Sequence, residues 1–446
     1  MTSNSSFRRA SLASVLVLAL ALSVGGCGKN KGKITPTVGA RQPILSKIEA
    51  GTKVDDSIAS MAVVLPAPEV NDEFAQGGGN AAKSYGHVAI GNAPVRAWSV
   101  GIRGSSPKQR LAASPVIGAG RLYVMDTEGT VHAFNAQTGA RIWQTSFRAD
   151  KQNATSTFGG GAAFDDGMVY VTNGVGEVGA IDAATGAVKW RVKPAGPMRG
   201  SPTVAFGQVM VMTQDNQIIA LNADDGAVLW NENASVGQTN VFGVASPAAG
   251  QGTIVAGYSS GELVAYRYEN GRELWADALA RTSIATSVST LTDIDADPII
   301  ERGRVYALGQ GGRMAAYELV TGQRIWELNL AGISTPAIAG DWIFTLTDEA
   351  KLLCIAKSNG KVRWMVQLQR YRNEKKKKNQ IYWTGPVLAG NRLWLANSRG
   401  EVVAASATDG TVSPFAKVGS AVSLAPVVAN QTLYILDDGG KITAFR

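Results

Sequence analysis

The chain has 446 residues, of which 45% are hydrophobic and 17% are charged, and it contains 51 glycines. This composition excludes an intrinsically disordered protein and a coiled coil, and it is typical of a globular protein rich in turns. The formal net charge is +8, but the basic residues are concentrated in a few short segments, so their local distribution says more about partners than the total does.

Residues 1–26 have the pattern of a secretory signal peptide. Arg8 and Arg9 precede an uncharged apolar stretch over 12–24, which is shorter than the roughly 20 residues that a membrane-spanning helix needs. The sequence Ser-Val-Gly-Gly-Cys at 23–27 resembles the lipobox of bacterial lipoproteins. The resemblance implies cleavage before Cys27, lipidation of Cys27 with acyl chains such as palmitate, and attachment to a membrane surface. An ordinary cleaved signal with an incidental cysteine is the alternative.

Residues 27–93 are expected to be a lipidated N-terminus followed by a mostly flexible tether. The stretch lacks sustained periodicity, and it is interrupted by Pro36, Pro43, Pro66, Pro68 and three consecutive glycines at 77–79. One short ordered piece is expected near 58–65. In lipoproteins, an aspartate directly after the lipidated cysteine favours retention at the inner membrane. Gly28 stands there, so the family rule implies the outer membrane, on the side facing the periplasm.

Internal repeats cover the rest of the chain, from 94 to 446. A glycine, alternating apolar positions, an alanine, a polar turn with a second glycine, and a tryptophan recur in six full copies, which end at Trp143, Trp190, Trp230, Trp275, Trp326 and Trp364. A seventh copy carries Pro414-Phe415 in place of the tryptophan, and an eighth is cut off at Arg446. The segment around Trp98 matches the missing end of the eighth copy. A proline precedes seven of the eight copies, as in Ser201-Pro202 and Asp297-Pro298.

Each repeat predicts four short antiparallel strands, with pairs such as Asp225-Gly226 and Asn270-Gly271 supplying the hairpin turns. Eight units of this kind predict an all-β fold: an eight-bladed β-propeller of four-stranded antiparallel blades over 94–446. We expect the strand around Trp98 to pair with residues 441–445, so that the N- and C-terminal strands close the ring. The repeat tryptophans are expected to lie between neighbouring blades as structural residues.

The repeats resemble those of pyrroloquinoline quinone enzymes. Together with the lipobox and the eight-fold ring they resemble the BamB family, lipoproteins of the outer-membrane β-barrel assembly machinery. This resemblance implies a non-catalytic scaffold that docks on the periplasmic domains of BamA and aids folding and insertion of outer-membrane β-barrel proteins. It implies a single copy within a hetero-complex, with unfolded outer-membrane proteins as further partners. A quinone-dependent dehydrogenase and a lipoprotein that binds other envelope ligands are the alternatives.

Catalytic and cofactor motifs are not found in the sequence. The adjacent cysteines of quinone dehydrogenases are missing, since Cys27 and Cys354 are the only two, and Cys354 is expected to be a buried structural thiol. His87 and His132 are the only histidines and are expected to be structural. The aspartates at 293, 295 and 297 do not fit an EF-hand loop, because proline stands at its sixth position and arginine at its twelfth. We therefore predict no catalytic residue, no cofactor and no metal site.

Two connections between blades are longer than the others, and both are expected on the same face of the ring. The first ends in Leu-Thr-Asp-Ile-Asp at 291–295, which resembles a BamB loop that contacts BamA. The resemblance assigns partner binding to Leu291, Asp293 and Asp295, with turn capping by the carboxylates as the alternative. Val241 and Phe242 in a neighbouring connection are expected to add apolar contact, although the arginine of the family is missing from 239–244.

The second long connection is strongly basic. Residues 370–378 hold six basic side chains and one acidic one, and the basic residues are Arg370, Arg372, Lys375, Lys376, Lys377 and Lys378. In an exported protein this run does not indicate nucleic acid. Contact with an anionic lipid surface, contact with an acidic partner, and a solvated loop all remain open.

Overall fold

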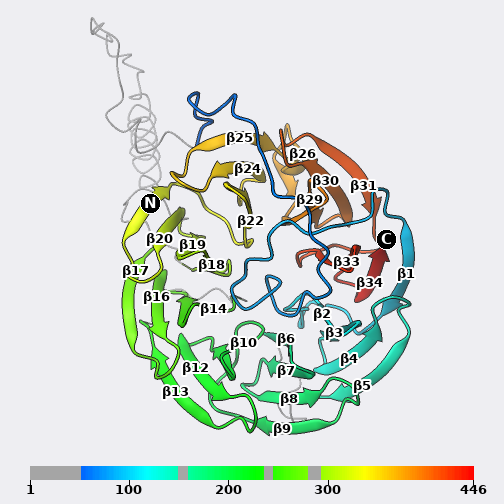
Figure 1. Cartoon of the computed structure of the whole chain (residues 1–446). Coiled ribbons are helices and arrows are strands. Elements are labelled where there is room, and N and C mark those ends of the chain that lie inside the picture. Colours follow the sequence, from blue (N-terminus) through cyan, green and yellow to red (C-terminus); the bar gives the residue numbers. More distant parts are fainter. Residues whose placement is uncertain (1–51, 149–158, 236–244, 280–292) are drawn as a thin grey trace, which may run out of the picture. The chain divides into compact units, whose positions relative to one another are not determined.

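Every sequence repeat forms one four-stranded antiparallel sheet in the computed structural model, which describes residues 52–148, 159–235, 245–279 and 293–446. Eight such sheets stand around a central axis as the blades of a propeller (Figure 1). The fold class predicted from the repeats is therefore confirmed. The described residues form no helix, so none of them builds a helix that could span a membrane.

The first four blades run from the innermost to the outermost strand in chain order. Blade 1 is β2 (Val116–Gly118), β3 (Arg121–Met125), β4 (Thr130–Asn135) and β5 (Arg141–Ser146); blade 2 is β6 (Gly160–Asp165), β7 (Met168–Asn173), β8 (Val178–Asp182) and β9 (Val188–Val192). Blade 3 is β10 (Thr203–Ala205), β11 (Gln208–Met212), β12 (Gln217–Asn222) and β13 (Val228–Asn233); blade 4 is β14 (Ala248–Gly250), β15 (Thr253–Gly257), β16 (Glu262–Arg267) and β17 (Glu273–Ala278).

The next three blades follow the same order. Blade 5 is β18 (Ile299–Glu301), β19 (Arg304–Gly309), β20 (Arg313–Glu318) and β21 (Arg324–Leu328), and blade 6 is β22 (Ala337–Ala339), β23 (Trp342–Leu346), β24 (Lys351–Ala356) and β25 (Val362–Gln367). Blade 7 is β28 (Trp383–Ala389), β29 (Arg392–Asn397), β30 (Glu401–Ser406) and β31 (Val412–Lys417). A separate two-stranded hairpin, β26 (Tyr371–Asn373) and β27 (Lys378–Gln380), lies in the connection between blades 6 and 7.

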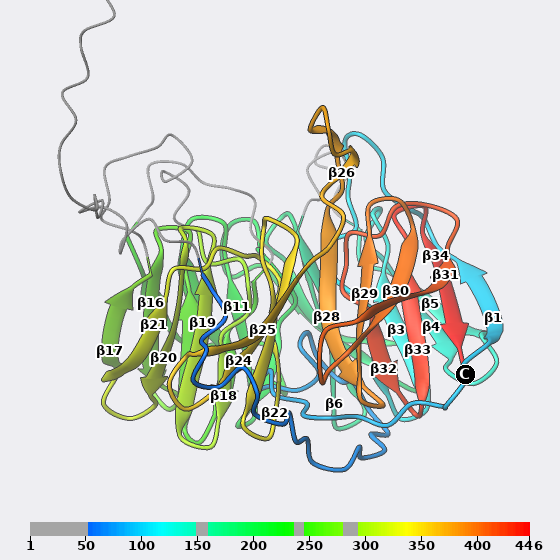
Figure 2. The same cartoon turned by 90° about the horizontal axis from the view of Figure 1, so that it is seen from above.

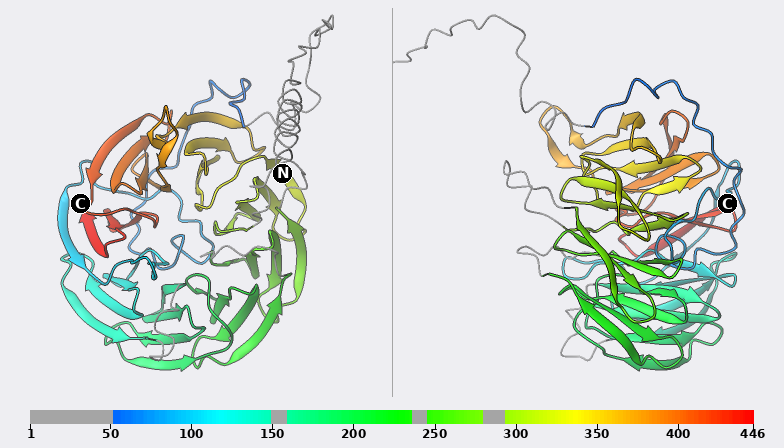
Figure 3. Two further views of the ribbon diagram at one scale, coloured as in Figure 1. Left: turned by 180° about the vertical axis from the view of Figure 1, so that it is seen from behind. Right: turned by 60° about the vertical axis from the view of Figure 1, so that its left-hand side comes forward.

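Blade 8 joins the two ends of the propeller sequence. It consists of β32 (Val427–Ala429), β33 (Thr432–Leu436), β34 (Lys441–Phe445) and, as the outermost strand, β1 (Arg96–Gly101). Strand β1 pairs antiparallel with β34, with Trp98 opposite Ala444 and Val100 opposite Ile442. The red C-terminal strand therefore lies against the cyan strand β1 (Figure 1 and Figure 3). The closure expected from the incomplete eighth repeat is confirmed.

The apolar core lies between neighbouring blades. The cluster between blades 1 and 2, for example, contains Val116, Tyr123, Ala162 and Val169. Inner strands such as β11 are buried along their whole length because blades cover both of their faces, whereas the outermost strand β5 alternates between exposed and half-buried residues. This explains why the sequence shows continuous apolar runs for inner strands and alternation for outer ones.

The repeat tryptophans join each blade to the next one. Each ring lies over the glycine of the neighbouring blade's last turn, and its indole Nε1 donates a hydrogen bond of 2.8–3.3 Å to a backbone carbonyl there. The seven residues are Trp98, Trp143, Trp190, Trp230, Trp275, Trp326 and Trp364. Their predicted structural role is confirmed. In blade 7, Phe415 instead packs edge-on against Trp394 and Phe445, with ring centroids 4.8 and 5.1 Å apart.

The two ends of the ring differ (Figure 2). Because strands alternate in direction, the connections between blades and the turns between second and third strands share one end, which we call the connection face; Arg199, Asp293 and the hairpin β26–β27 belong to it. The other end, the turn face, carries the turns between first and second strands, among them those at Gly120, Gly340 and Gly390.

Residues 52–93, which we call the strap, pack on the propeller, and here the structure differs from the expected flexible tether. The compact unit that contains the ring begins at Gly51. The strap enters beside blade 6, where the Asp55 N–H donates to the Val362 carbonyl at 2.9 Å, and then crosses the opening of the ring on the turn face (Figure 1 and Figure 2). Phe74, Lys83 and Val88 are each at most 5% exposed.

Inner strands hold the strap in place. Their free backbone edges pair with it at successive blades, including Phe74 with Ile117, Ala75 with Phe164, Ala81 with Ala249 and Ala82 with Ile300, over 2.7–2.9 Å. His87 is buried, with Nδ1 donating to the Pro66 carbonyl and Nε2 accepting from the Asn391 N–H, both at 2.8 Å. Its expected structural role is confirmed. The hydrogen-bond partners of the strap lie in the blades and not in the strap itself, so the strap needs no sequence periodicity of its own.

Candidate functional site

A buried arginine gathers two of the predicted partner-binding aspartates on the connection face. Arg199 Nη2 lies 2.8 Å from Asp293 Oδ1, 3.3 Å from Asp295 Oδ1 and 3.4 Å from the Ile294 carbonyl oxygen. The side chains of Arg199 and Asp293 are each 1% exposed, and that of Asp295 is 10% exposed. The carboxylates therefore point toward Arg199, and Asp293 offers almost no surface to another molecule.

The backbones on both sides of this ion cluster are fixed. The Arg199 N–H donates to the Met212 carbonyl at 2.8 Å, and the Arg199 carbonyl accepts from Gly160 at 3.1 Å, which places the residue between blades 2 and 3. On the other side the Asp293 carbonyl accepts from Gln310 at 2.9 Å.

Ile294, between the two aspartates, is fully buried in the core of blades 4 and 5. A Cβ on Gly257 would lie only 2.4 Å from Ile294 Cγ2, which is too close for two carbon atoms, so glycine is required at 257.

Charge in the cluster is unbalanced, since one guanidinium faces two carboxylates. Burial is the main cause that raises the pKa of Asp295 to about 7, and the neighbouring Asp293 raises it further, against the opposing effect of Arg199. Burial also raises the pKa of Asp293, which Arg199 again opposes. Arg199 Nε and Nη1 and Asp293 Oδ2 are buried and have no hydrogen-bond partner among the described residues.

A second polar layer lies closer to the strap. Asp297 Oδ1 accepts from the Ser246 N–H at 2.7 Å, and the Asp297 N–H donates to Thr335 Oγ1 at 3.0 Å. Ser246 Oγ in turn donates to the Ser201 carbonyl at 2.8 Å. The residue before each of these prolines thus bonds to its counterpart in the neighbouring blade, which gives the recurring Ser/Thr/Asp-Pro pattern a structural reason.

Lys83 of the strap reaches this layer from the turn face. Its Nζ donates to Thr203 Oγ1 at 3.1 Å, and the side chain is buried opposite Asp297. Burial lowers the pKa of Lys83, and it raises the pKa of Asp297, an effect that the charge of Lys83 opposes. The centre of the ring therefore holds two cations that come from different parts of the chain.

The other predicted partner-binding residues fall elsewhere. Leu291, Val241 and Phe242 lie outside the described residues. The chain re-enters the described part at Ala245 and at Asp293, and the hydrogen bond between Ser246 and Asp297 joins these two re-entry points. The described residues that follow these two segments therefore lie next to each other in the ring.

Sequence reasoning missed Arg199. It looked for the arginine in 239–244, whereas the structure places an arginine from the preceding connection against the aspartates. The signal was present: Arg199 stands two residues before Ser201-Pro202, where the chain turns inward toward the axis.

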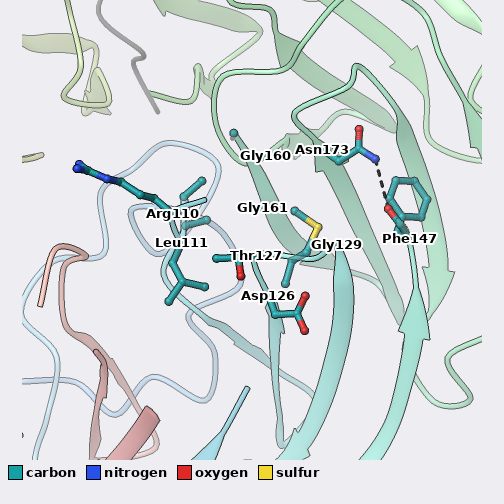
Figure 4. A pocket seen from close by; sticks show the side chains of 13 residues that line it. Arg110, Leu111, Asp126, Thr127, Gly129, Phe147, Gly160, Gly161 and Asn173 are labelled. Carbon is teal, nitrogen blue, oxygen red and sulfur yellow. Dashed lines mark hydrogen bonds between the residues drawn. The ribbon is translucent and has the colours of Figure 1, made fainter. Parts of the chain in front are cut away.

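A small pocket between blades 1 and 2 contains no arrangement for catalysis (Figure 4). The one carboxylate that lines it belongs to Asp126, and both of its oxygens already accept hydrogen bonds. The donors are His132 Nε2 and the backbone N–H groups of Glu128 and Thr130, all at 2.9 Å. This contact confirms that His132 is structural.

Metal and thiol chemistry find no support in the described part of the chain. Over 52–148, 159–235, 245–279 and 293–446, no group of three or more His, Cys, Asp or Glu side chains could hold a metal ion. Cys354 is a free, fully buried thiol, and burial raises its pKa well above the usual value. Its predicted structural role is confirmed.

Comparisons with known proteins agree on one family. The sequence profile described as outer membrane protein assembly factor BamB matches residues 95–158 and 127–366. Proteins with that name from Yersinia pestis and Escherichia coli K12 are 26% and 27% identical to the chain, over 89% and 78% of it and 95% and 88% of their own lengths. The protein of that name from Vibrio cholerae is 32% identical over 57% of this chain and 65% of its own.

Solved structures show the same fold. BamB from Moraxella catarrhalis superimposes with a TM-score of 0.67 at 20% identity, covering 79% of this chain and 99% of that one. A quinohemoprotein alcohol dehydrogenase from Comamonas testosteroni also has a TM-score of 0.67, at 15% identity, covering 88% of this chain and 82% of that one. At these identities the structures establish the propeller and do not distinguish a scaffold from an enzyme.

Proposed function

The chain belongs to the family of the outer membrane protein assembly factor BamB, and from this premise we propose that it is a non-catalytic scaffold of the outer-membrane β-barrel assembly complex. In this role it docks on the periplasmic domains of BamA and aids folding and insertion of outer-membrane β-barrel proteins. The proposal places its docking surface on the connection face.

One observation carries the docking proposal: the Ser246–Asp297 hydrogen bond of 2.7 Å ties together the ends of the two connections marked for partner contact. Arg199 adds a second tie to the 293–295 stretch. These two ties restrain the described ends of the two connections, which lowers the entropic cost of binding a partner there. In this proposal Asp293 acts by positioning its connection, and Asp295, which is partly exposed, is the one of the two that reaches the partner directly.

The proposed location is the periplasmic face of the outer membrane. We propose a signal peptide over 1–26 and lipidation at Cys27, as the lipobox implies. The lipid anchor would then hold the folded unit, which begins near residue 52, at the membrane surface through the intervening chain.

Unfolded outer-membrane proteins are proposed as clients of the outer blade edges. Extended chains can add to an open strand edge through backbone hydrogen bonds. The molecule contains an example, because Val54 of the strap forms a parallel bridge with Val362 at the edge of β25. We expect strand β13 in blade 3 to offer a comparable edge.

Affinity purification tests the docking proposal. The tagged mature protein is recovered from gently solubilised envelopes beside the asparagine variant Arg199→Met/Asp293→Asn/Asp295→Asn and the arginine variant Asp293→Arg/Asp295→Arg. A matched control replaces two exposed aspartates of the turn face, Asp224→Arg/Asp341→Arg. We expect wild type and the control to recover BamA, and the arginine variant to lose it.

The asparagine variant, which also carries Arg199→Met, keeps this test interpretable if the arginine variant does not fold. It removes both negative charges and the buried cation between them with little change of volume, so no buried charge lacks a partner, and it should fold and recover less BamA than wild type does. Recovery of no large outer-membrane barrel protein by wild type would contradict the proposed function. Undiminished recovery by a folded asparagine variant would leave the function intact and contradict the docking site.

A further inference from the structure

The basic connection forms a defined hairpin that projects from the connection face. Strands β26 and β27 pair through Tyr371 with Gln380 and Asn373 with Lys378, and the pair stands above the ring (Figure 2). Every residue from Arg372 to Gln380 is exposed. The basic connection is thus a protruding two-stranded element whose tip carries consecutive lysines.

The positive charge of the hairpin is not neutralised within the described residues. Arg372 and the lysines 375–378 form no ion pair with any described carboxylate. Glu374, the single acidic residue of the run, is exposed as well, and its Oε1 accepts from the N–H groups of Arg370 and Tyr371 at 2.8 and 3.0 Å. The hairpin therefore presents five cations to the outside against one carboxylate.

Packing at its base keeps the hairpin upright. The Ile381 N–H donates to the Arg370 carbonyl at 2.8 Å, and Trp383 Nε1 donates to the Gln369 carbonyl at 2.8 Å. Tyr382 beside them is 65% exposed, although its backbone is fixed by Ser398. A fixed basic tip above the exposed Tyr382 side chain matches the chemistry of the membrane interface, where Tyr lies at headgroup depth and Lys meets anionic lipid.

The position of the chain's N-terminal end favours a membrane as the partner. The strap meets the ring at β25, the strand that leads directly into the hairpin. Between Cys27 and residue 52 lie 24 residues, which span at most about 85 Å when fully extended. A lipid at Cys27 would hold the same sector of the ring within that distance of a bilayer at all times, which raises the effective concentration of lipid headgroups around the hairpin.

We propose that the hairpin β26–β27 docks on the anionic phospholipid surface to which Cys27 anchors the chain, as a second membrane contact beside the lipid. The inference rests on the lipid anchor of the proposed function. Two contacts, the acyl chains and the basic hairpin, fix the orientation of the ring relative to the bilayer, whereas an anchor alone leaves the ring free to turn. The docked hairpin turns the connection face of blades 6 and 7 toward the membrane.

Vesicle sedimentation with the purified mature chain tests the proposal. Cys27→Ser removes the lipid, so binding reports the protein surface alone. Vesicles of phosphatidylethanolamine and phosphatidylglycerol are compared with vesicles of phosphatidylcholine, at low and at high salt. The test variant is Lys375→Gln/Lys376→Gln/Lys377→Gln/Lys378→Gln. The matched control removes four exposed positive charges elsewhere, Arg96→Gln/Arg272→Gln/Arg302→Gln/Arg392→Gln.

We expect the starting protein to bind the anionic vesicles only, with binding weakened by salt. The test variant should lose at least about thirtyfold in partition coefficient, since each lysine near an anionic surface contributes about fivefold. The control should stay within about threefold of the starting protein. Absence of binding to anionic vesicles at low salt, or equal binding by the test variant, would overturn the proposal.

Two further measurements separate this inference from its alternatives. Lys29→Gln/Lys31→Gln/Lys33→Gln tests the lysines beside the lipidation site; if this variant alone loses binding, the membrane contact is there and the hairpin proposal is wrong. The hairpin variant is also taken through the BamA affinity purification. Loss of BamA with vesicle binding unchanged would assign the hairpin to an acidic protein surface, whereas failure of wild type to recover BamA contradicts the proposed function and leaves the vesicle result standing.

Discussion

Arg199 Nη2 lies 2.8 Å from Asp293 Oδ1, although the two residues are 94 positions apart and belong to different connections. The ion pair crosses the inside of the ring, so it links blades that do not adjoin in sequence. It also determines how firmly the connection that carries Asp293 and Asp295 is held.

Replacing Arg199 with methionine is expected to destabilise the folded protein by about 3–5 kcal/mol, because two buried carboxylates lose their only cation. Urea denaturation of Arg199→Met measures the loss. Adding Asp293→Asn and Asp295→Asn to the same chain should restore a large part of it, since no buried charge then lacks a partner. A loss below about 1 kcal/mol would show that the cluster is hydrated and contributes little.

The stability of the protein is expected to fall as the pH rises from about 5 to 8. The folded-state pKa of Asp295 is about 7, against an ordinary value of 3.8, so between these values the folded chain binds more protons than the unfolded chain. The stabilisation is complete below the ordinary pKa and is lost as the pH passes the raised one. The stability lost between pH 5 and 8 should be on the order of 1–3 kcal/mol, and Asp295→Asn should remove most of this loss.

The control for the pH profile is Asp409→Asn. Asp409 lies in an exposed turn, and hydrogen bonds from Thr411 and Ser406 lower its pKa, so its titration is finished well below pH 5. This variant should keep the slope of the wild type between pH 5 and 8. If Asp295→Asn keeps it as well, the protons are bound elsewhere.

A pair of glycine substitutions in blade 2 measures the tryptophan contact between blades. Gly186 and Gly167 have nearly equal positive φ angles, +78° and +77°, so alanine carries a similar backbone cost at both. A Cβ at 186 would meet the ring of Trp143 at 2.8 Å, whereas a Cβ at 167 meets nothing within 4 Å. Urea denaturation should show Gly186→Ala about 1–3 kcal/mol less stable than Gly167→Ala. Equal losses would mean that the blades shift apart at little cost.

Lys83→Met tests whether the strap is locked into the ring. The substitution leaves buried Asp297 without its cation, and about 3 kcal/mol of stability should be lost. Limited proteolysis should then cleave within 52–93 faster than in the wild type. Lys53→Met, at an exposed position of the same segment, is the matched control and should change neither result. Restoration by Lys83→Met/Asp297→Asn would assign the effect to the buried pair.

Sequence periodicity predicted the ring because each blade repeats the same local pattern. The glycine of the last turn and the tryptophan of the fourth strand mark each of blades 1 to 6. The alanine of the third strand marks blades 1 to 5, with Cys354 in its place in blade 6, and the segment around Trp98 identified the closing strand. These features depend on contacts within one blade or with the next one, so short-range patterns record them.

Contacts between residues that are far apart in the chain produce no repeated pattern in the sequence. The strap lacks its own periodicity because its hydrogen bonds go to residues such as Ile117 and Ala249, and its prolines and glycines read as a tether. Arg199 escaped notice for a related reason: its partners lie in a connection two blades away. The basic run at 370–378 was visible by composition, but its hairpin geometry and the hydrogen bonds that Glu374 accepts at its base were not.

The strap also determines when folding can finish. Its hydrogen bonds with Arg363, Asn391 and Asn430 span 302, 304 and 358 positions. Strand β1 likewise can pair only after β34, at the end of the chain, has been made. In the proposed export the N-terminal residues cross the inner membrane first, so they remain unpaired until the last blades have followed. Closure is therefore a late, long-range event. During that interval the segment 52–93 and the edge of β34 lack the hydrogen-bond partners that they have in the closed ring.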